Sequence, residues 1–133
     1  MQLAHLFYRS SGRLDAFDRD CDDILSVARQ RNGEAGLTGF LHAEDGMFLQ
    51  WIEGAPELLD PVIASILADT RHRDITILGQ GPVAARKFSS WSMGFSQGRT
   101  APLFEWLAKD DANSRDVTAY AQSLQRFLLA RAA

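Results

Sequence analysis

The chain of 133 residues has a single cysteine, Cys21, so neither an intrachain disulfide nor a cysteine-rich zinc site can form. It also lacks an excess of basic charge. Its 14 Lys and Arg residues stand against 17 Asp and Glu residues, and the net charge of −3 argues against a nucleic-acid surface. No apolar run approaches the ~20 residues that span a bilayer, and residues 1–5 do not resemble the start of a signal peptide. These features predict a cytoplasmic protein with neither a nucleic-acid nor a membrane partner.

Histidine is scarce as well, and the three that occur, His5, His42 and His72, are too scattered for the spacing of a metal site. Four aspartates at 18, 20, 22 and 23 lie close in sequence, but a helix spreads them around its axis. We therefore expect a solvated helix face there and no bound cation. Cys21 falls on the apolar side of the same predicted helix, where it should be a small buried hydrophobic residue.

The hydrophobic content of 46% and the charged content of 23% are ordinary for a globular domain with its own core. Asn32-Gly33 predicts the end of the first helix, Ser10-Ser11-Gly12 a break after the first strand, and Asp45-Gly46 a tight hairpin turn. The predicted elements are a strand at 2–9, a helix at 15–31, strands at 36–43 and 47–52, a helix from 56 to 69–72, and strands at 74–79, with room to continue past Gly81-Pro82, and at 91–95.

This order of elements is the βαββαβ plan of a ferredoxin-like α+β fold with one added strand, βαββαββ. We expect a five-stranded mixed sheet with two helices on one face and a ligand site in the cleft between helices and sheet. Beyond residue 98, apolar residues at helical spacing predict a short helix and a longer one at 115–131. Residues 1–98 should form the main domain, and residues 99–133 a C-terminal helical extension that packs on it.

One polar residue stands out in the second strand of the predicted hairpin. Gln50 lies among the large apolar residues of the segment 48–54. An unpaired amide in a buried strand costs about 1–3 kcal/mol, so the side chain needs partners within the protein or on a ligand. A primary amide both donates and accepts, and it can therefore connect a donor on one side to an acceptor on the other.

Seven blocks of residues occur in an order and spacing that resemble the BLUF family, the blue-light sensors that use FAD, in its short single-domain form. The resemblance covers roughly the first hundred residues. The blocks are Tyr8-Arg9-Ser10, Asn32, Gly36-Leu37-Thr38-Gly39, Asp45 to Gly54, Asp69-Thr70-Arg71-His72, Arg86-Lys87-Phe88 and Trp91-Ser92-Met93.

The resemblance implies a noncovalently held FAD whose ring lies between the two helices and faces the sheet. Tyr8 would give an electron to the photoexcited flavin, and Gln50 would bridge the Tyr8 hydroxyl to the ring. Electron and proton transfer along this path would then rearrange the hydrogen bonds of the flavin and redshift its absorption. The cofactor-binding positions implied are Ile24 and Ile66 on either side of the ring, Asn32 at its pyrimidine edge, Gln50, Arg31, and the pair Arg71 and His72.

Signal relay is implied for the strand that carries Trp91 and Met93, and which of the two lies near Gln50 stays open. Two positions depart from the family pattern. Arg31 stands where family members often have asparagine or histidine, and Ala28 where a serine is common. Both should lie near the flavin, where Arg31 could reach the pyrophosphate as a charged donor.

Each of these residues also has an ordinary structural interpretation. Tyr8 alone would be a core aromatic residue, Gln50 alone would bond to backbone, and Asn32 before Gly33 is a common helix end. For Trp91 and Met93 we expect packing in the core in preference to a part in the chemistry, even within this family. The combination favours the photochemical interpretation.

We therefore predict a blue-light receptor that is not an enzyme and that signals through protein–protein contacts. The partner would be an unidentified downstream protein or a second copy of the chain. The alternative is a light-insensitive ferredoxin-like adaptor, against which the presence of Tyr8, Gln50 and Asn32 counts. A small acylphosphatase-like hydrolase ranks last, because it would need a phosphate-cradling loop where only residues 10–13 follow the first strand.

Overall fold

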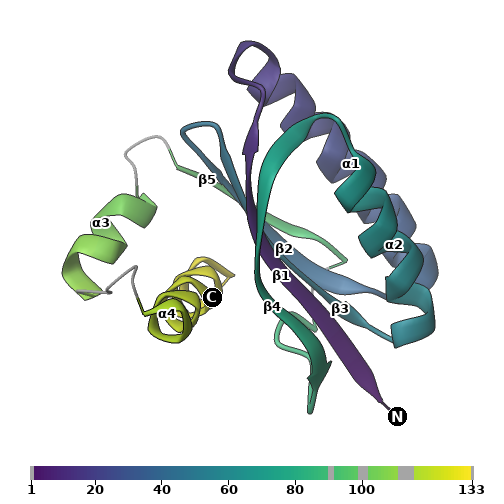
Figure 1. Ribbon diagram of the computed structural model, residues 1–133. Helices are drawn as coiled ribbons and strands as arrows, with labels where there is room; N and C mark the ends of the chain where they lie inside the picture. The colour runs from purple at the N-terminus through teal and green to yellow at the C-terminus, as the bar shows by residue number, and fades with distance from the viewer. Residues whose placement is uncertain (1, 90–91, 99–101, 111–115, 133) are drawn as a thin grey trace.

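The computed structural model describes residues 2–89, 92–98, 102–110 and 116–132. Within these residues the fold is α+β, as predicted, with five strands and four α-helices (Figure 1). The elements are β1 (Leu3–Gly12), α1 (Phe17–Ala35) preceded by a short 3-10 turn at Leu14–Ala16, β2 (Thr38–Glu44), β3 (Met47–Gly54), α2 (Pro56–Ala68), β4 (His72–Val83), β5 (Gly94–Gly98), α3 (Pro102–Asp110) and α4 (Val117–Ala132).

The strands form one mixed sheet in the order β4-β1-β3-β2-β5. All neighbours are antiparallel except β2 and β5, which run parallel. Helices α1 and α2 cover one face of the sheet, and α3 and α4 lie on the other side (Figure 1). This is the expected ferredoxin-like arrangement with one added strand and C-terminal helices.

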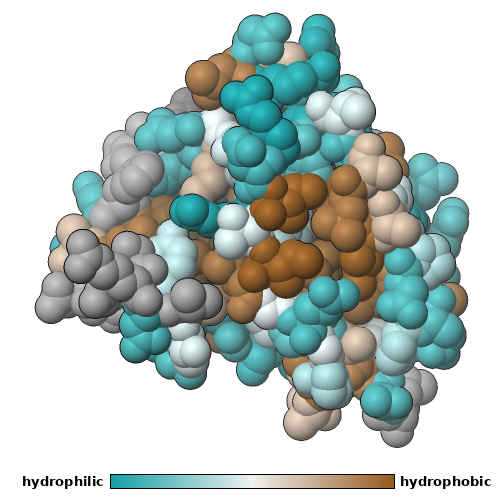
Figure 2. All heavy atoms as spheres, viewed as in Figure 1, coloured by the Kyte–Doolittle hydropathy of each residue, from teal (hydrophilic) through white to brown (hydrophobic). Residues whose placement is uncertain are grey.

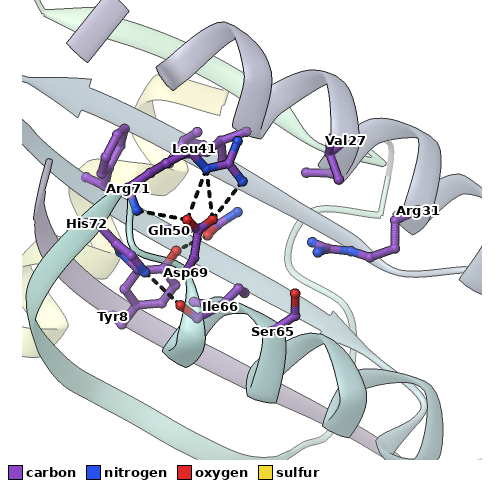
Figure 3. A pocket seen from close by; sticks show the side chains of 13 residues that line it. Tyr8, Val27, Arg31, Leu41, Gln50, Ser65, Ile66, Asp69, Arg71 and His72 are labelled. Atoms are coloured by element: carbon purple, nitrogen blue, oxygen red, sulfur yellow. Dashed lines mark hydrogen bonds and ion pairs between the residues drawn. The ribbon is translucent and has the colours of Figure 1, made fainter. Parts of the chain in front are cut away.

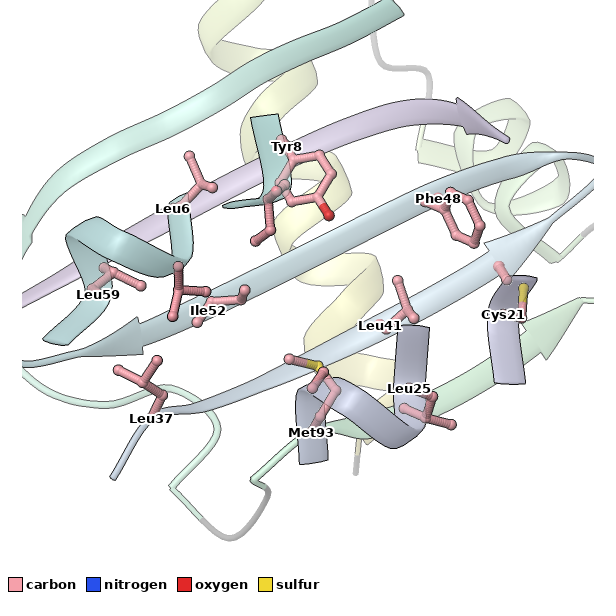
Figure 4. Close-up of a cluster of buried hydrophobic side chains, with 14 residues drawn as sticks. Leu6, Tyr8, Cys21, Leu25, Leu37, Leu41, Phe48, Ile52, Leu59 and Met93 are labelled. Carbon is pink, nitrogen blue, oxygen red and sulfur yellow. The ribbon is translucent and has the colours of Figure 1, made fainter. Parts of the chain in front are cut away.

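Each face of the sheet carries its own hydrophobic core. The core under α1 and α2 includes Leu6, Leu41, Ile52 and Met93 (Figure 4). The core under the C-terminal helices joins Phe7, Trp51 and Phe88 to side chains of α3 and α4. In Figure 2, apolar atoms gather in the middle of the visible face, around the edge strand β4, within a polar surround. No helix within the described parts of the chain is both long and apolar enough to cross a membrane.

The hairpin turn occurs where the sequence predicted it. Asp45 and Gly46 have φ angles of 48° and 76°, the left-handed values that a two-residue turn between twisted strands requires. The turn sets the register of β2 against β3, with Glu44 opposite Met47 and Leu41 opposite Gln50. Because side chains alternate along a strand, Gln50 then faces α1 and α2 and Trp51 faces the C-terminal helices.

Two predicted boundaries were wrong at the start of the chain. β1 does not stop before residues 10–12 but continues to Gly12, because Ser10 pairs with Phe48 of β3 and Gly12 pairs with His72 of β4. The ladder on both sides outweighs the turn preference of serine and glycine.

The first helix also runs past Asn32 and Gly33, to Ala35. Its end is set by Gly36, whose φ of 68° lies in the left-handed region, and the backbone N–H groups of Gly36 and Leu37 both donate to the carbonyl of Asn32. Gly36 fits this conformation without a side-chain penalty, and Gly33 is accommodated inside the helix.

The last strand is displaced from its predicted position at 91–95 to Gly94–Gly98. Ser92 and Met93 instead attach to α1 through their carbonyl groups, which accept hydrogen bonds from Asn32 Nδ2 at 2.8 Å and Arg29 Nε at 3.0 Å. Residues held to a helix in this way are not available to the sheet. Trp91 lies outside the described residues.

The aspartate cluster was also predicted incorrectly in part. Three of the four aspartates are exposed, but Asp20 is only 2% exposed. Its two carboxylate oxygens accept hydrogen bonds of 2.8 and 2.9 Å from Nη2 and Nε of Arg13. This bidentate pair attaches the segment before α1 to the helix, so Asp20 belongs to the structure and not to a solvated face.

Candidate functional site

A cleft opens between α1, α2 and the sheet, as the order of elements predicted. Figure 3 shows its lining, which comes from both helices, from β1, β2 and β3, from the turn after α2 and from the first residue of β4. The lining residues are Tyr8, Ile24, Val27, Ala28, Arg31, Leu41, Phe48, Gln50, Ser65, Ile66, Asp69, Arg71 and His72.

Tyr8 and Gln50 form the polar centre of this cleft. They are directly opposite each other on the neighbouring strands β1 and β3, so their side chains emerge on the same face. The Tyr8 hydroxyl donates a hydrogen bond to Oε1 of Gln50 (Figure 3), and both side chains are buried. Burial, and secondarily the charge of Asp69, raises the pKa of Tyr8 well above its ordinary value, so the phenol is neutral at pH 7.

The other end of the Gln50 amide contacts Met93. Nε2 of Gln50 donates to the Met93 sulfur at 3.6 Å, and Met93 is 2% exposed. Gln50 therefore connects β1 to the residue that precedes β5, through one donor and one acceptor. Of the two residues implied in signal relay, Met93 is the one that the described structure brings to Gln50.

Apolar side chains form the two walls of the cleft. Ile24 and Ala28 of α1 stand on one side and Ile66 of α2 on the other, with Leu41 and Phe48 contributed by the sheet. The predicted sandwich positions Ile24 and Ile66 thus come from opposite helices. Sites for aromatic ligands have this composition of apolar walls around a few convergent polar groups.

The rim of the cleft is charged. Arg71 makes a bidentate ion pair with Asp69, with Nη2 and Oδ2 2.7 Å apart, and this pair holds the pKa of Asp69 below its usual range. His72 bridges the Ser10 hydroxyl and the Ile66 carbonyl, with both contacts at 2.7 Å. Arg31, half-buried on α1, extends its guanidinium into the space between the helices (Figure 3).

Among the predicted cofactor-binding residues, Asn32 is not in the lining of the cleft. It is fully buried, and its Nδ2 donates to the Ser92 carbonyl at 2.8 Å. Its Oδ1 accepts a hydrogen bond of 3.4 Å from Arg31 Nε. In this structure Asn32 ties α1 to the segment before β5 and orients a residue that does line the cleft.

Sequence reasoning did not assign Val27, Ser65 or Asp69 to the site. Val27 lies three residues after Ile24, so helical spacing from this assigned residue could have found it. Ser65 lies directly before Ile66, and this spacing does not predict that the two side chains share a face. Asp69 belongs to one of the sequence blocks named above, but its role as the partner of Arg71 needed the turn geometry after α2.

The residues present fit the cofactor that the sequence implies. A flat ring with polar edges finds apolar walls from two helices, an amide that can donate or accept, and guanidinium groups suited to phosphates. The free volume of the cleft is about 70 Å³, which is less than the ~300–1,000 Å³ of ordinary ligand sites. Arg31 and the exposed Val27 are among the side chains that line this narrow space.

Comparison with known proteins decides the family. Residues 3–94 match the family model described as BLUF, sensors of blue-light using FAD. The chain belongs to the BLUF family. It is a blue-light sensor that uses FAD, and the matched region contains every element of the cleft.

Several BLUF proteins are similar to this chain. It is 41% identical over 71 residues to the beta subunit of a photoactivated adenylate cyclase from Euglena longa, a match that covers 53% of this chain and 8% of the subunit. It is 32% identical over 91 residues to the blue light- and temperature-regulated antirepressor BluF of Escherichia coli, covering 68% of this chain and 23% of that protein. The chain thus matches only a small part of these relatives.

Two solved structures are similar over nearly the whole length. The dark-state structure of BlrB, a BLUF protein, superposes with a TM-score of 0.74 at 32% identity, covering 96% of this chain and 98% of that one. The photo-activated state of BlsA superposes with a TM-score of 0.76 at 26% identity, covering 95% and 91%. The similarity to BlrB extends beyond the family match into the C-terminal helices.

Proposed function

We propose that Tyr8 and Gln50 carry out the light reaction of this sensor and that the chain itself catalyses no turnover of a substrate. The single observation that carries the proposal is the buried hydrogen bond from the Tyr8 hydroxyl to Gln50 Oε1, inside a cleft with apolar walls. FAD, when bound, supplies absorption of blue light and an excited state that accepts an electron.

Tyr8 is the electron source. Because burial disfavours its charged form, the hydroxyl cannot ionise beforehand, and loss of an electron makes it strongly acidic. Its proton then leaves along the existing hydrogen bond to Gln50. When the electron and proton return, Tyr8 is regenerated and no bond has been consumed.

The change that persists after the light reaction is in the Gln50 side-chain amide. Its amide can come back rotated or tautomerised, with donor and acceptor exchanged relative to the dark state. A new hydrogen bond from the amide then accounts for a small redshift of the absorption. In this structure Nε2 points to the Met93 sulfur, so a rotated amide would present an oxygen to an atom that has no hydrogen to donate.

The remaining site residues hold the cofactor in this proposal. Ile24 and Ile66 enclose the ring, and Arg71 and His72 flank it. Arg31 is the charged donor available to the pyrophosphate. Asn32 acts at the pyrimidine edge directly or, as its contacts suggest, by orienting Arg31 and Ser92. These assignments rest on the positions of the side chains around the cleft.

Residues 1–98 form the flavin-binding unit in this proposal, and residues 99–133 form the part that contacts a partner. The partner is a downstream protein or another copy of the chain. Among the relatives, one is named an adenylate cyclase subunit and another an antirepressor, so the outputs of BLUF proteins differ in kind. A location in the cytoplasm stays a prediction from the sequence.

The test is the visible absorption of the FAD-loaded protein before and after blue illumination. The wild-type protein should shift its flavin bands reversibly to longer wavelength. Tyr8→Phe and Gln50→Leu should bind FAD without that shift. The only other tyrosine, Tyr120, lies on α4 across the sheet, so Tyr120→Phe is the matched control and should shift normally.

A normal redshift in Tyr8→Phe or Gln50→Leu would overturn the proposed light reaction. A wild-type protein that binds FAD but shows no shift would also overturn the light reaction, whereas a protein that takes up no FAD would favour the light-insensitive adaptor that the sequence left as the alternative.

A further inference from the structure

A series of polar side chains, hydrogen-bonded to one another, lies on the far side of the sheet from the cleft. The proposed light reaction does not use it. Its centre is His42 of β2, which is fully buried. The His42 ring contacts Ser96 Oγ of β5 through Nδ1 at 2.7 Å and Glu44 Oε1 through Nε2 at 2.9 Å. Glu44 is also buried, and the same oxygen accepts the backbone N–H of Leu103 in the first turn of α3 at 2.9 Å.

The chemistry of the three groups orders their hydrogen bonds. Burial lowers the pKa of His42, so the ring is neutral and carries one N–H. Glu44 Oε1 already accepts the Leu103 N–H, and an acceptor oxygen facing the ring assigns the ring N–H to Nε2. Nδ1 is then an acceptor, and the Ser96 hydroxyl must donate to it. A displacement of Ser96 would leave a buried ring nitrogen without its donor.

This series of polar side chains begins close to the cleft. Met93, whose sulfur accepts the Gln50 amide, is three residues before Ser96. Ser96 is paired with His42 in the parallel register of β5 and β2. A movement of Met93 along or across the sheet therefore reaches the Ser96–His42 contact through one short strand.

At its other end, the same series of polar side chains contacts both C-terminal helices. Through Glu44 it reaches the N-terminal turn of α3. The His42 ring also stands edge-on to Phe127 of α4, with centroids 4.8 Å apart, and Phe127 in turn contacts Trp106 of α3 with centroids 5.8 Å apart.

We propose that Ser96, His42 and Glu44 are positioning residues that couple the orientation of the Gln50 amide to α3 and α4. The coupling rests on the proposed function, because the amide must change for a signal to exist. In the dark state the three residues hold both helices against β2 and β5. Displacement of Met93 by the rotated amide shifts Ser96, breaks its bond to His42 and releases α3 and α4.

The experiment is hydrogen–deuterium exchange of the FAD-loaded full chain, in the dark and under continuous blue light, with the redshift recorded on the same samples. In the wild-type protein, peptides from α3 and α4 should exchange faster in the light. Ser96→Ala, which removes one partly exposed hydroxyl, should keep the full redshift and lose the light-dependent difference in these peptides. His42→Gln is a second variant with the same expected result.

The matched control is Ser123→Ala. This variant also removes one serine hydroxyl, which accepts a hydrogen bond from Trp106 Nε1 at 3.2 Å between α3 and α4. It should keep both the redshift and the exchange difference.

The coupling is overturned if Ser96→Ala and His42→Gln retain the light-dependent difference, or if Ser123→Ala loses it equally. It is also overturned if wild-type α3 and α4 do not respond to light, or if Ser96→Ala loses the redshift itself. A wild-type protein without a redshift is a failure of the proposed function, and the spectra separate that case from the others.

Discussion

Gln50 and Met93 are joined by a hydrogen bond of 3.6 Å, from the amide Nε2 to the thioether sulfur. The sulfur is a weak acceptor and cannot donate, so the contact is favourable for one orientation of the amide and unfavourable for the other. Tyr8 holds the opposite end of the same amide. The contact of the residue that leads into β5 therefore depends on which way the amide points.

Met93→Leu should lengthen the lifetime of the redshifted state. Leucine has a similar volume and packs with a cost below ~1.5 kcal/mol, but it offers the amide no acceptor. The dark orientation loses a hydrogen bond worth about 0.5–1.5 kcal/mol, so dark recovery should slow by roughly two- to tenfold. The measurement is the decay of the redshift after a light pulse. Recovery faster than in the wild-type protein would contradict the assigned contact.

Asn32→Ala should weaken the protein even without FAD. The substitution removes the fully buried Asn32 amide and its hydrogen bond to the Ser92 carbonyl, so the free energy of unfolding should fall by about 0.5–1.5 kcal/mol. Urea denaturation of the flavin-free protein measures this change, and a fluorescence titration with FAD measures any loss of affinity. If Asn32 only contacted the flavin, the affinity would fall and the stability of the flavin-free protein would stay the same.

Glu53→Gln should destabilise the connection between β4 and β5. The buried Glu53 carboxylate accepts from Trp51 Nε1, the Thr38 hydroxyl and the backbone N–H groups of Lys87 and Phe88, at 2.7 to 3.0 Å. An amide would turn an NH₂ group towards some of these donors, and the free energy of unfolding should fall by about 2 kcal/mol.

The control for this substitution is Glu57→Gln on the exposed face of α2, which should change stability by no more than ~0.5 kcal/mol. Equal urea midpoints for the two variants would show that the Glu53 contacts contribute nothing to stability.

Stability should fall on mild acidification because of buried histidine. Burial lowers the pKa of His42, and also that of His5, below the ordinary 6.5. The unfolded chain then binds more protons than the folded one as the pH drops below 6.5, so folded stability is full above that pH and is lost towards the folded pKa. Each histidine contributes at most about 1.4 kcal/mol per pH unit in this window.

His42→Gln should therefore show a smaller loss of stability between pH 7 and pH 5.5 than the wild-type protein, as measured by urea midpoints at each pH. The remaining slope belongs to His5 and other groups. An unchanged slope in His42→Gln would mean that the ring is protonated as easily in the fold as in the unfolded chain.

The sequence predicted the sheet and the two helices over it, because strand alternation, helical spacing and the Asp45-Gly46 turn are local signals. The contact of Tyr8 with Gln50 and the placement of Ile24 and Ile66 on opposite helices were implied by the resemblance to the BLUF family. Boundaries were less predictable. The extension of β1 depends on pairing with two other strands, and the end of α1 depends on which of two glycines takes the left-handed conformation.

Contacts between residues far apart in the sequence could not be predicted from local sequence patterns. The burial of Asp20 depends on where Arg13 returns to the helix. The side chain of Asn32 turns to Ser92, 60 residues further along the chain, and this partner is known only once β5 is placed beside β2. The same holds for His42 and Ser96, whose proximity follows from a parallel crossover that no periodicity encodes.

The two-residue turn at Asp45 and Gly46 makes this sensor intolerant of length changes at one point. β3 is paired on one side with β1 and on the other with β2, and Gln50 faces the cleft only in the register that both pairings share. One inserted residue in the turn would force β3 either to bulge or to give up one neighbour, and a slip of one position would put the side chain of Trp51 or Leu49 where the amide belongs. Tags and linkers inserted into this hairpin should therefore abolish the light response of the protein even when they leave it folded.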